Sequence, residues 1–256
     1  MKKLLCLIVA IAILGLTVSG CSIPLKSVVP TSEKGDPKPE LVTPTLEKIT
    51  FIHYAKDSNR SKPVWDETVD IYKLMFGGIK WADTMQYEVN PDGSDLEEAE
   101  VLGALGASLE TWNDAITGDF KLFNVDLEIT EKGFVSGEEL FEEELVRINR
   151  VTWGVLPWEN AIAMCRFWFN PATKEIVESD VVFSIDFDWS VDETCSGVKM
   201  DLQSIATHEF GHNGLNDLYM PPSIELTMYG YSGYDETDKR TLGTGDISGI
   251  QELYGE

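Results

Sequence analysis

Residues 201–217 read DLQSIATHEFGHNGLND, and this stretch decides the fold that the sequence predicts. Asp201 suits the N-cap of a helix whose apolar residues recur on one side: Leu202, Ile205, Ala206 and Phe210. On that helix His208 and His212 are four residues apart, which rotates one imidazole by only about 40° from the other and raises it by about 6 Å. Both rings can therefore reach one tetrahedral metal ion.

Glu209 follows the first histidine and points beside the place where a metal would lie. From there a carboxylate can take a proton from a metal-activated water and later pass it to a leaving amine. A five-residue HExxH string can also arise by chance, and it would then be two surface histidines on an acidic helix. The remaining sequence has to decide between these two interpretations.

A catalytic zinc needs a third protein ligand, and the sequence offers few candidates. The chain has three histidines, and the third, His53, lies far upstream. Asp217 is the leading candidate, with Asn216 as an alternative, because carboxylate oxygen is an ordinary zinc ligand and an amide is a poor one.

Residues 208–217 (HEFGHNGLND) resemble the extended metzincin motif HExxHxxGxxH/D, and HEFGH with the Gly-Leu pair resembles its matrixin branch. In that motif the glycine and the third ligand come three and six residues after the second histidine. Gly214 and Asp217 come two and five after His212, so one residue is missing. We therefore expect the helix to end early, at a glycine that tolerates left-handed angles. The resemblance keeps Asp217 as the third ligand, since some metzincins use aspartate there.

Two downstream segments resemble the same family. Leu226-Thr227-Met228-Tyr229 resembles the matrixin Met-turn, which implies that Met228 is an apolar floor under the zinc; otherwise it is an ordinary core methionine. Residues 242–255 resemble the closing helix of matrixin catalytic domains, and Asp246 matches the acid that hydrogen-bonds to the Met-turn. A chance HExxH string would not bring these segments in the family's order.

The predicted fold class is α+β, a zincin (metzincin) fold with a mixed twisted sheet, a long first helix, an active-site helix and a C-terminal helix after the Met-turn. The long helix is expected at 96–116, capped by Ser94. Strands are expected at 85–89, 120–127, 145–155, 161–170 and 176–186, with a hairpin turn at 170–173. In the family, the strand at the position of 161–170 is an exposed edge that pairs with extended peptide substrates through main-chain groups.

The N-terminus predicts export from the cytoplasm. Residues 1–20 are expected to be a signal peptide, because two lysines precede an apolar run that is too short to span a membrane comfortably. Val18-Ser19-Gly20-Cys21 resembles the lipoprotein box of bacteria and archaea, which implies a lipid anchor on Cys21. If Cys21 is not lipidated, the protein is expected to be secreted.

Three further regions follow the signal. Residues 21–48 are poor in large apolar side chains and predict a flexible tether. Residues 49–77 are expected to be ordered against the main domain, with a strand pattern at Ile49, Phe51 and His53, but the sequence assigns them no role. Residues 78–256 have no second linker and predict one matrixin-like metallopeptidase domain.

Charge and cysteine content narrow the partners. Removal of Lys2 and Lys3 with the signal changes the formal charge from −24 to −26, which argues against nucleic acid as a partner. The acidic cluster at 138–144 is interpreted as a solvated face; calcium binding there is possible but not indicated. Cys165 and Cys195 remain in the mature chain, and an even pair in an oxidising compartment predicts a disulfide.

The resemblance implies a zinc-dependent endopeptidase that acts on extracytoplasmic proteins or peptides. One Zn²⁺ would be held by His208, His212 and Asp217, with Glu209 as general base. The alternative is a lipoprotein that kept the metzincin shell, lost activity and acts as a binding module. No stretch resembles the cysteine-containing pro-segment of matrixins, so latency by thiol ligation is not predicted. The sequence determines neither the natural substrate nor the oligomeric state.

Overall fold

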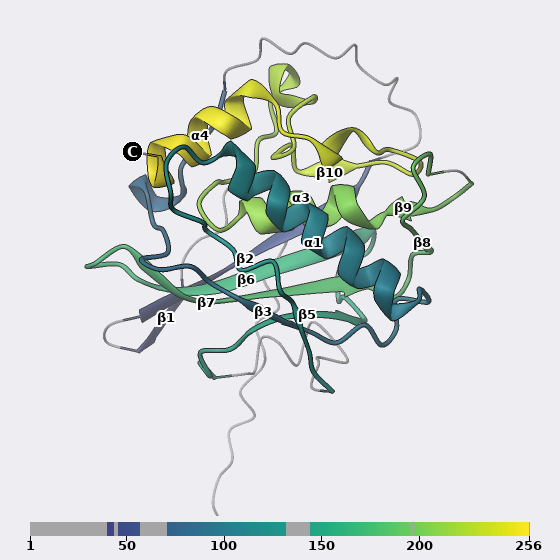
Figure 1. The fold of residues 1–256 in the computed structure, drawn as a ribbon, viewed down its shortest axis with the longest axis horizontal. Coiled ribbons are helices and arrows are strands. Elements are labelled where there is room, and N and C mark those ends of the chain that lie inside the picture. Colours follow the sequence, from purple (N-terminus) through teal and green to yellow (C-terminus); the bar gives the residue numbers. More distant parts are fainter. Residues whose placement is uncertain (1–39, 44–45, 57–70, 132–143, 196, 256) are drawn as a thin grey trace, which may run out of the picture.

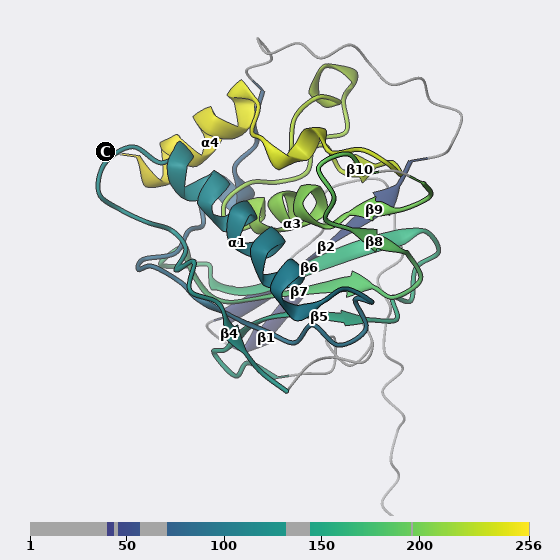
Figure 2. The same cartoon turned by 45° about the vertical axis from the view of Figure 1, so that its right-hand side comes forward.

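A computed structural model describes residues 40–43, 46–56, 71–131, 144–195 and 197–255. In this part of the chain three helices cover one face of a mixed β-sheet, and both views of the ribbon show the same layering (Figures 1 and 2). The predicted signal, Cys21, most of the tether and the acidic cluster up to residue 143 lie outside the described residues. Among the described helices, none is long and apolar enough to cross a membrane.

The main sheet has the strand order β1-β2-β6-β7-β5-β3-β4, and β10 pairs with β2 off this path. Strands β7, β5, β3 and β4 run parallel, whereas β6 is antiparallel to β7, β2 to β6, and β1 to β2. A small separate sheet joins β8 and β9. The strand bounds are β1 (Glu40–Thr43), β2 (Leu46–Ala55), β3 (Tyr87–Val89), β4 (Glu128–Ile129), β5 (Asn149–Gly154), β6 (Ala161–Asn170), β7 (Glu175–Ser184), β8 (Trp189–Ser190), β9 (Met200–Asp201) and β10 (Tyr231–Ser232).

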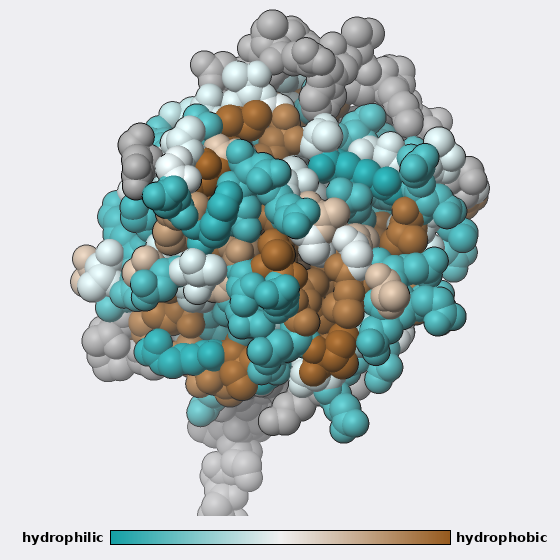
Figure 3. Space-filling view, in the orientation of Figure 1, coloured by the Kyte–Doolittle hydropathy of each residue, from teal (hydrophilic) through white to brown (hydrophobic). Residues whose placement is uncertain are grey.

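The main core lies between the sheet and the helices. Its helices are α1 (Glu98–Ala115), α3 (Leu202–Gly211) and α4 (Thr244–Tyr254), with short 3-10 turns η1 (Met75–Gly77), η2 (Pro221–Ser223) and η3 (Asp238–Arg240). Trp112 of α1 is fully buried and donates its indole N–H to the Thr207 carbonyl of α3 at 2.7 Å. This bond fixes α1 directly against α3. The face shown in Figure 3 is largely hydrophilic, with separate hydrophobic patches.

Most predicted elements are confirmed. The strand predicted at 161–170 has those bounds, and the turn after it forms because the Asn170 side chain accepts N–H bonds from Ala172 and Thr173. The predicted cap of the long helix is wrong. Ser94 accepts the Leu96 N–H at 3.2 Å, while Glu97 is the N-cap residue and donates its own N–H to the Glu100 carboxylate at 3.1 Å.

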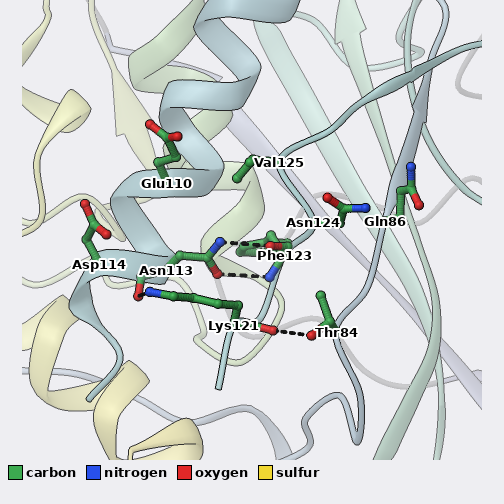
Figure 4. A pocket seen from close by; sticks show the side chains of 9 residues that line it. All are labelled: Thr84, Gln86, Glu110, Asn113, Asp114, Lys121, Phe123, Asn124 and Val125. Atoms are coloured by element: carbon green, nitrogen blue, oxygen red, sulfur yellow. Dashed lines mark hydrogen bonds between the residues drawn. The ribbon is translucent and has the colours of Figure 1, made fainter. Parts of the chain in front are cut away.

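The prediction of a strand at 120–127 is also wrong, because a side chain of α1 binds main-chain groups of this segment that a neighbouring strand would otherwise bind. Asn113 of α1 donates from Nδ2 to the Phe123 carbonyl at 2.8 Å and accepts the Phe123 N–H on Oδ1 at 3.0 Å (Figure 4). Around this contact the segment forms an isolated bridge between Met85 and Phe123. The alternating apolar residues of this segment therefore pack against α1 and do not form a strand.

An open pocket of about 730 Å³ lies between α1 and the same segment (Figure 4). Its lining residues are linked by the Asn113 contacts and by Thr84, which donates to the Lys121 carbonyl at 2.7 Å. None of its lining residues is a predicted metal ligand or the predicted base. The pocket is thus separate from the site that the sequence predicts.

The N-terminal strands require two corrections. Residues 40–43 and 46–48 belong to β1 and β2, so the described end of the predicted tether is part of the sheet. Ile49, Phe51 and His53 are buried on one face of β2, as their alternation predicts. Because β2 joins the same sheet as β6, the boundary predicted at residue 78 does not separate two structural units.

Strand β6 is not an exposed edge, contrary to the expectation from the family. Strand β2 pairs along it from Glu47 opposite Phe169 to Tyr54 opposite Ala161.

The predicted disulfide between Cys165 and Cys195 is also contradicted, since both cysteines are free. Cys165 lies in the middle of β6 with its sulfur 3.8 Å from the Ser179 hydroxyl, whereas the Cys195 sulfur lies 3.7 Å from the Lys199 carbonyl in the loop after β8. The two sulfurs have different neighbours, and an even count of cysteines carries no such spatial information.

The contact of α1 with α3 yields a stability prediction. A Cβ added at Gly211 would lie 2.3 Å from the Met228 sulfur and 2.6 Å from the Trp112 ring, whereas nothing lies within 4 Å of a Cβ added at Gly103 in α1. We expect Gly211→Ala to lower the free energy of unfolding by about 2 kcal/mol or more. Gly103→Ala should raise it by up to about 1 kcal/mol. Urea denaturation of the metal-free variants measures both, and equal effects would refute the close packing.

Candidate metal centre

Helix α3 begins where the sequence predicts and carries the histidines into the core. Asp201 caps it by accepting the Ser204 N–H on Oδ1 at 2.8 Å, and the guanidinium of Arg240 pairs with the same carboxylate. The helix ends at Gly211, and His212 follows with helical angles as its C-cap. Its last turn therefore places both imidazoles on the side that faces β2 and the loop after the helix.

The chain leaves α3 through a turn that brings Asp217 back to the histidines. Gly214 was expected to adopt left-handed angles, but it is not among the glycines with positive φ. It is instead required by close packing, because an added Cβ would lie 2.5 Å from Leu253 of α4. Asn213 fixes the turn from inside, since its carbonyl accepts the Tyr254 hydroxyl at 2.7 Å and its Oδ1 accepts the Trp81 indole N–H at 2.7 Å.

One oxygen of Asp217 lies close to both histidines. Its Oδ1 atom is 3.2 Å from Nε2 of His208 and 3.7 Å from Nε2 of His212, and the three ligand atoms lie within 4.8 Å of one another. Ligands about 2.0–2.2 Å from a tetrahedral zinc are themselves separated by about 3.3 Å. The separations in the structure fit this geometry, and for Asn216 the structure shows only a main-chain bond, from its N–H to the Lys73 carbonyl at 2.8 Å.

The main chain orients both imidazoles for metal binding. Nδ1 of His208 lies 2.7 Å from the Thr227 carbonyl, and Nδ1 of His212 lies 3.1 Å from the Leu215 carbonyl. A carbonyl can only accept, so Nδ1 donates in each ring and the lone pair of a neutral ring is on Nε2. Burial keeps the rings neutral, since it lowers the pKa of His208 well below its ordinary value and that of His212 to about 4.

The turn at 226–229 is anchored to α4, as the family resemblance predicts. The Asp246 carboxylate accepts the N–H groups of Thr227 at 2.8 Å, Met228 at 3.2 Å and Gly243 at 2.9 Å. Met228 is buried against Gly211 of α3. Because the carbonyl of Thr227 also binds His208, the Asp246 contact positions one of the candidate ligands.

Glu209 is fully buried next to the candidate ligands. Burial raises the pKa of its carboxyl well above the ordinary value, and the nearby Asp217 adds to the effect. Its Oε1 atom lies 3.1 Å from Nδ1 of His53, while Oε2 has no hydrogen-bond partner among the described residues. A buried polar atom without a partner is costly unless something else binds it. Oε2 is thus the atom available for a water or a substrate group.

Sequence reasoning missed His53, which reaches the site from β2. Its Nε2 atom lies 2.9 Å from the Ser232 hydroxyl of β10, and its ring centroid lies 3.9 Å from that of His208. Burial lowers the pKa of His53 well below its ordinary value, so its neutral ring contacts Glu209 through a hydrogen bond. The alternation at 49–53 was a signal for burial, but it did not indicate which residues lie on the other side.

Two other residues of the site had no signal in the sequence. Tyr219 donates its hydroxyl to Oδ2 of Asp217 at 2.9 Å, which leaves Oδ1 directed toward the histidines. Lys239 donates to the Tyr229 carbonyl, and burial lowers its pKa to about 7. The two neutral imidazoles and the carboxylate of Asp217 form a donor set that suits zinc, and Glu209 lies beside it.

Comparison with known proteins relates the part of the chain that contains this site to a peptidase family. The family model described as Matrixin (Peptidase_M10) matches residues 163–255, which include β6, β7, α3 and α4. The chain is also similar to a protein named Metalloendoproteinase 4-MMP of Arabidopsis thaliana, with 26% identity over 106 residues. That similarity covers 39% of this chain and 27% of the relative. The chain therefore spans about a quarter of the relative's length. The comparisons suggest a zinc metallopeptidase-type domain, and the mixed sheet with its helices is consistent with a matrixin domain.

The link from Asp246 to His208 yields a prediction. Asp246→Asn replaces an acceptor-only group that binds three N–H groups with one that has a single acceptor oxygen. We expect the free energy of unfolding to fall by about 1–3 kcal/mol. Zinc affinity should fall about 10–100-fold, because Thr227 no longer orients His208. The exposed Asp114 gives the matched control, Asp114→Asn, which should change neither quantity in denaturation and zinc titration.

Proposed function

We propose that this chain is a zinc-dependent endopeptidase that hydrolyses peptide bonds of extracytoplasmic proteins or peptides. The observation that carries the proposal is the position of Asp217 Oδ1 between Nε2 of His208 and Nε2 of His212. The matrixin match over residues 163–255 supports the same reaction class. Glu209, buried beside these ligands, supports an enzyme over a binding module, because a module that only binds has no use for a general base.

His208, His212 and Asp217 would hold the zinc ion. The ion supplies Lewis-acid chemistry: it lowers the pKa of a water and polarises the carbonyl of the peptide bond. The main-chain carbonyls of Thr227 and Leu215 keep the histidine lone pairs on Nε2. Tyr219 keeps the second oxygen of Asp217 engaged, so that the carboxylate offers one oxygen.

Glu209 moves the proton in this mechanism. Its Oε2 atom accepts the proton of the attacking water and returns it to the leaving nitrogen of the cleaved bond. The raised pKa of the buried carboxyl brings its proton affinity closer to that of the groups with which it exchanges protons. Placement on the turn of α3 that also carries His208 keeps this oxygen beside the metal position.

We further propose that residues 1–20 are removed as a signal and that a lipid on Cys21 anchors the protein outside the cytoplasm. The support is the sequence alone, namely the charged start, the apolar run and the small residues before Cys21. The strongly acidic chain suits an anchor that does not depend on anionic lipid headgroups, since these would repel it.

The enzyme proposal makes a three-variant prediction. Glu209→Ala should keep stoichiometric zinc and lose cleavage of an unfolded protein substrate by at least about 100-fold, because general-base catalysis contributes about that much or more. Asp217→Ala should lose both zinc and cleavage. Asn216→Ala is the matched control next to the ligand and should retain zinc. Zinc content by atomic absorption and cleavage by gel measure all three.

The outcomes separate the alternatives. Cleavage that survives in Glu209→Ala would refute the mechanism. Zinc that is retained in Asp217→Ala but lost in Asn216→Ala would move the third ligand to Asn216. A wild-type chain that binds zinc and extended peptides but cleaves nothing would favour the inactive binding module.

The anchor makes a separate prediction. In a bacterial host that processes lipoproteins, the wild-type chain should enter the membrane fraction and Cys21→Ser should not, because the thiol that accepts the lipid is missing. Cys195→Ser, which changes a cysteine of the folded part, should behave as wild type. Fractionation and the mass of the mature N-terminus check this, and a membrane-bound Cys21→Ser variant would contradict it.

A further inference from the structure

His53 is buried between the candidate base and two groups that can donate hydrogen bonds. Its Nδ1 atom lies 3.1 Å from Oε1 of Glu209, and its Nε2 atom lies 2.9 Å from the Ser232 hydroxyl and 3.5 Å from Nζ of Lys239. These residues come from β2, α3, β10 and the turn η3, so four segments meet at one ring. His53 is 1% exposed and Glu209 is 0% exposed, so little solvent competes for these contacts.

The partners determine which nitrogen of the His53 ring carries the proton. A general base works as a carboxylate, which accepts hydrogen bonds and donates none. Nδ1 must therefore donate to Oε1 when Glu209 is ready to take a proton. Burial keeps the ring neutral by lowering the pKa of His53 well below its ordinary value, so Nε2 is then an acceptor. Both groups that face Nε2, the Ser232 hydroxyl and the Lys239 amine, can donate to it.

The hydrogen bond from His53 fixes how the carboxylate of Glu209 is turned. The last torsion of a glutamate side chain is broad and two-fold, so it does not hold the plane of the carboxylate by itself. Among the described residues, Nδ1 of His53 is the only hydrogen-bond partner of this carboxylate, since Oε2 has none. Fixing Oε1 fixes the plane of the group, and Oε2 remains the oxygen that can exchange a proton with a water or a leaving nitrogen.

The ring of His53 is itself held by the sheet. On one side β2 pairs with β6, where His53 lies opposite Ala163, and on the other side Ala55 lies opposite Ser232 of β10. The ring also packs on that of His208, with centroids 3.9 Å apart. A donor on a paired strand keeps its direction better than one on a loop. Strand β2 is thus a fixed part of the site.

We propose that His53 is a positioning residue for the candidate base: it donates from Nδ1 to Oε1 of Glu209, fixes the plane of the carboxylate and leaves Oε2 to accept the proton. Ser232 and Lys239 keep Nε2 of the ring as an acceptor. This role rests on the function proposed above, because the base that His53 positions acts in that reaction. His53 lies outside residues 163–255, the part of the chain that the matrixin model matches.

Two amide variants of His53 test the role of each ring nitrogen. The amide nitrogen of an asparagine can lie close to the place of Nδ1 in a histidine, whereas that of a glutamine can lie close to the place of Nε2. His53→Asn can therefore donate to Oε1 of Glu209, and His53→Gln cannot. Both variants lose the ring and gain one amide group, so each is the matched control of the other.

We expect the two variants to differ in kcat and not in KM when the zinc-loaded chains cleave a fluorogenic peptide. In His53→Gln, kcat should fall about 10–100-fold, as is typical when a residue that orients a catalytic group is lost. His53→Asn should retain most of the wild-type kcat. KM should stay unchanged in both, because the contact with Oε1 orients the base and adds no contact with the substrate. Both variants should keep stoichiometric zinc.

The outcomes separate the role of His53 from the peptidase proposal. Equal kcat in the two variants of an active enzyme, whether retained or lost, would overturn the role of His53 and leave the peptidase intact. Loss of zinc from His53→Gln alone would overturn it too, because the effect would then act through the metal ligands. A wild-type chain that cleaves nothing would refute the function, and with it the role of His53.

A second measurement needs no variant and covers the case in which the amide variants fail to fold. The chain has three histidines, so isotopic labelling of histidine nitrogens gives a spectrum with few signals. In the zinc-loaded wild-type chain at neutral pH, the long-range proton–nitrogen NMR spectrum should show the proton of the His53 ring on Nδ1. A proton on Nε2 would remove the donor to Oε1 of Glu209 and overturn the role of His53.

Discussion

The hydrogen bond from Nδ1 of His208 to the Thr227 carbonyl is the contact on which the site depends. It fixes the tautomer of a candidate ligand on α3, and Thr227 is in turn held by Asp246 of α4. Trp112 of α1 binds the Thr207 carbonyl one residue before the ligand. Three helices that are far apart in the sequence therefore meet within one turn of α3, and a shift of any of them would move His208.

Much of this arrangement could be predicted because its signals are local. The cap at Asp201, the histidine spacing and the turn at Asn170 each depend on a few neighbouring residues, and the structure has all three. The contact of Asp246 with the turn at 226–229 is long-range, and it was predicted only through the resemblance to a family in which that contact is known. Periodicity alone could not have found it.

The errors share a physical cause, which is that the competing partner lies elsewhere in the chain. The segment at 120–127 has strand alternation, but Asn113 takes its main-chain groups. Gly214 is explained by the side chain of Leu253 and not by its own backbone angles. The strand at 161–170 was predicted with its bounds, yet its neighbour β2 comes from a region for which no role was predicted. An element can be read from its own residues, whereas its neighbours cannot.

The contact of His53 with Glu209 shows why a closed site can still be stable. A buried carboxyl without a partner costs about 1–3 kcal/mol or more, and His53 offsets part of this cost by binding Oε1. The Ser232 hydroxyl engages the other nitrogen of the ring, so the imidazole has no unmet bond. The second oxygen, Oε2, has no hydrogen-bond partner among the described residues, and it is the atom that the proposed role of Glu209 as a base requires.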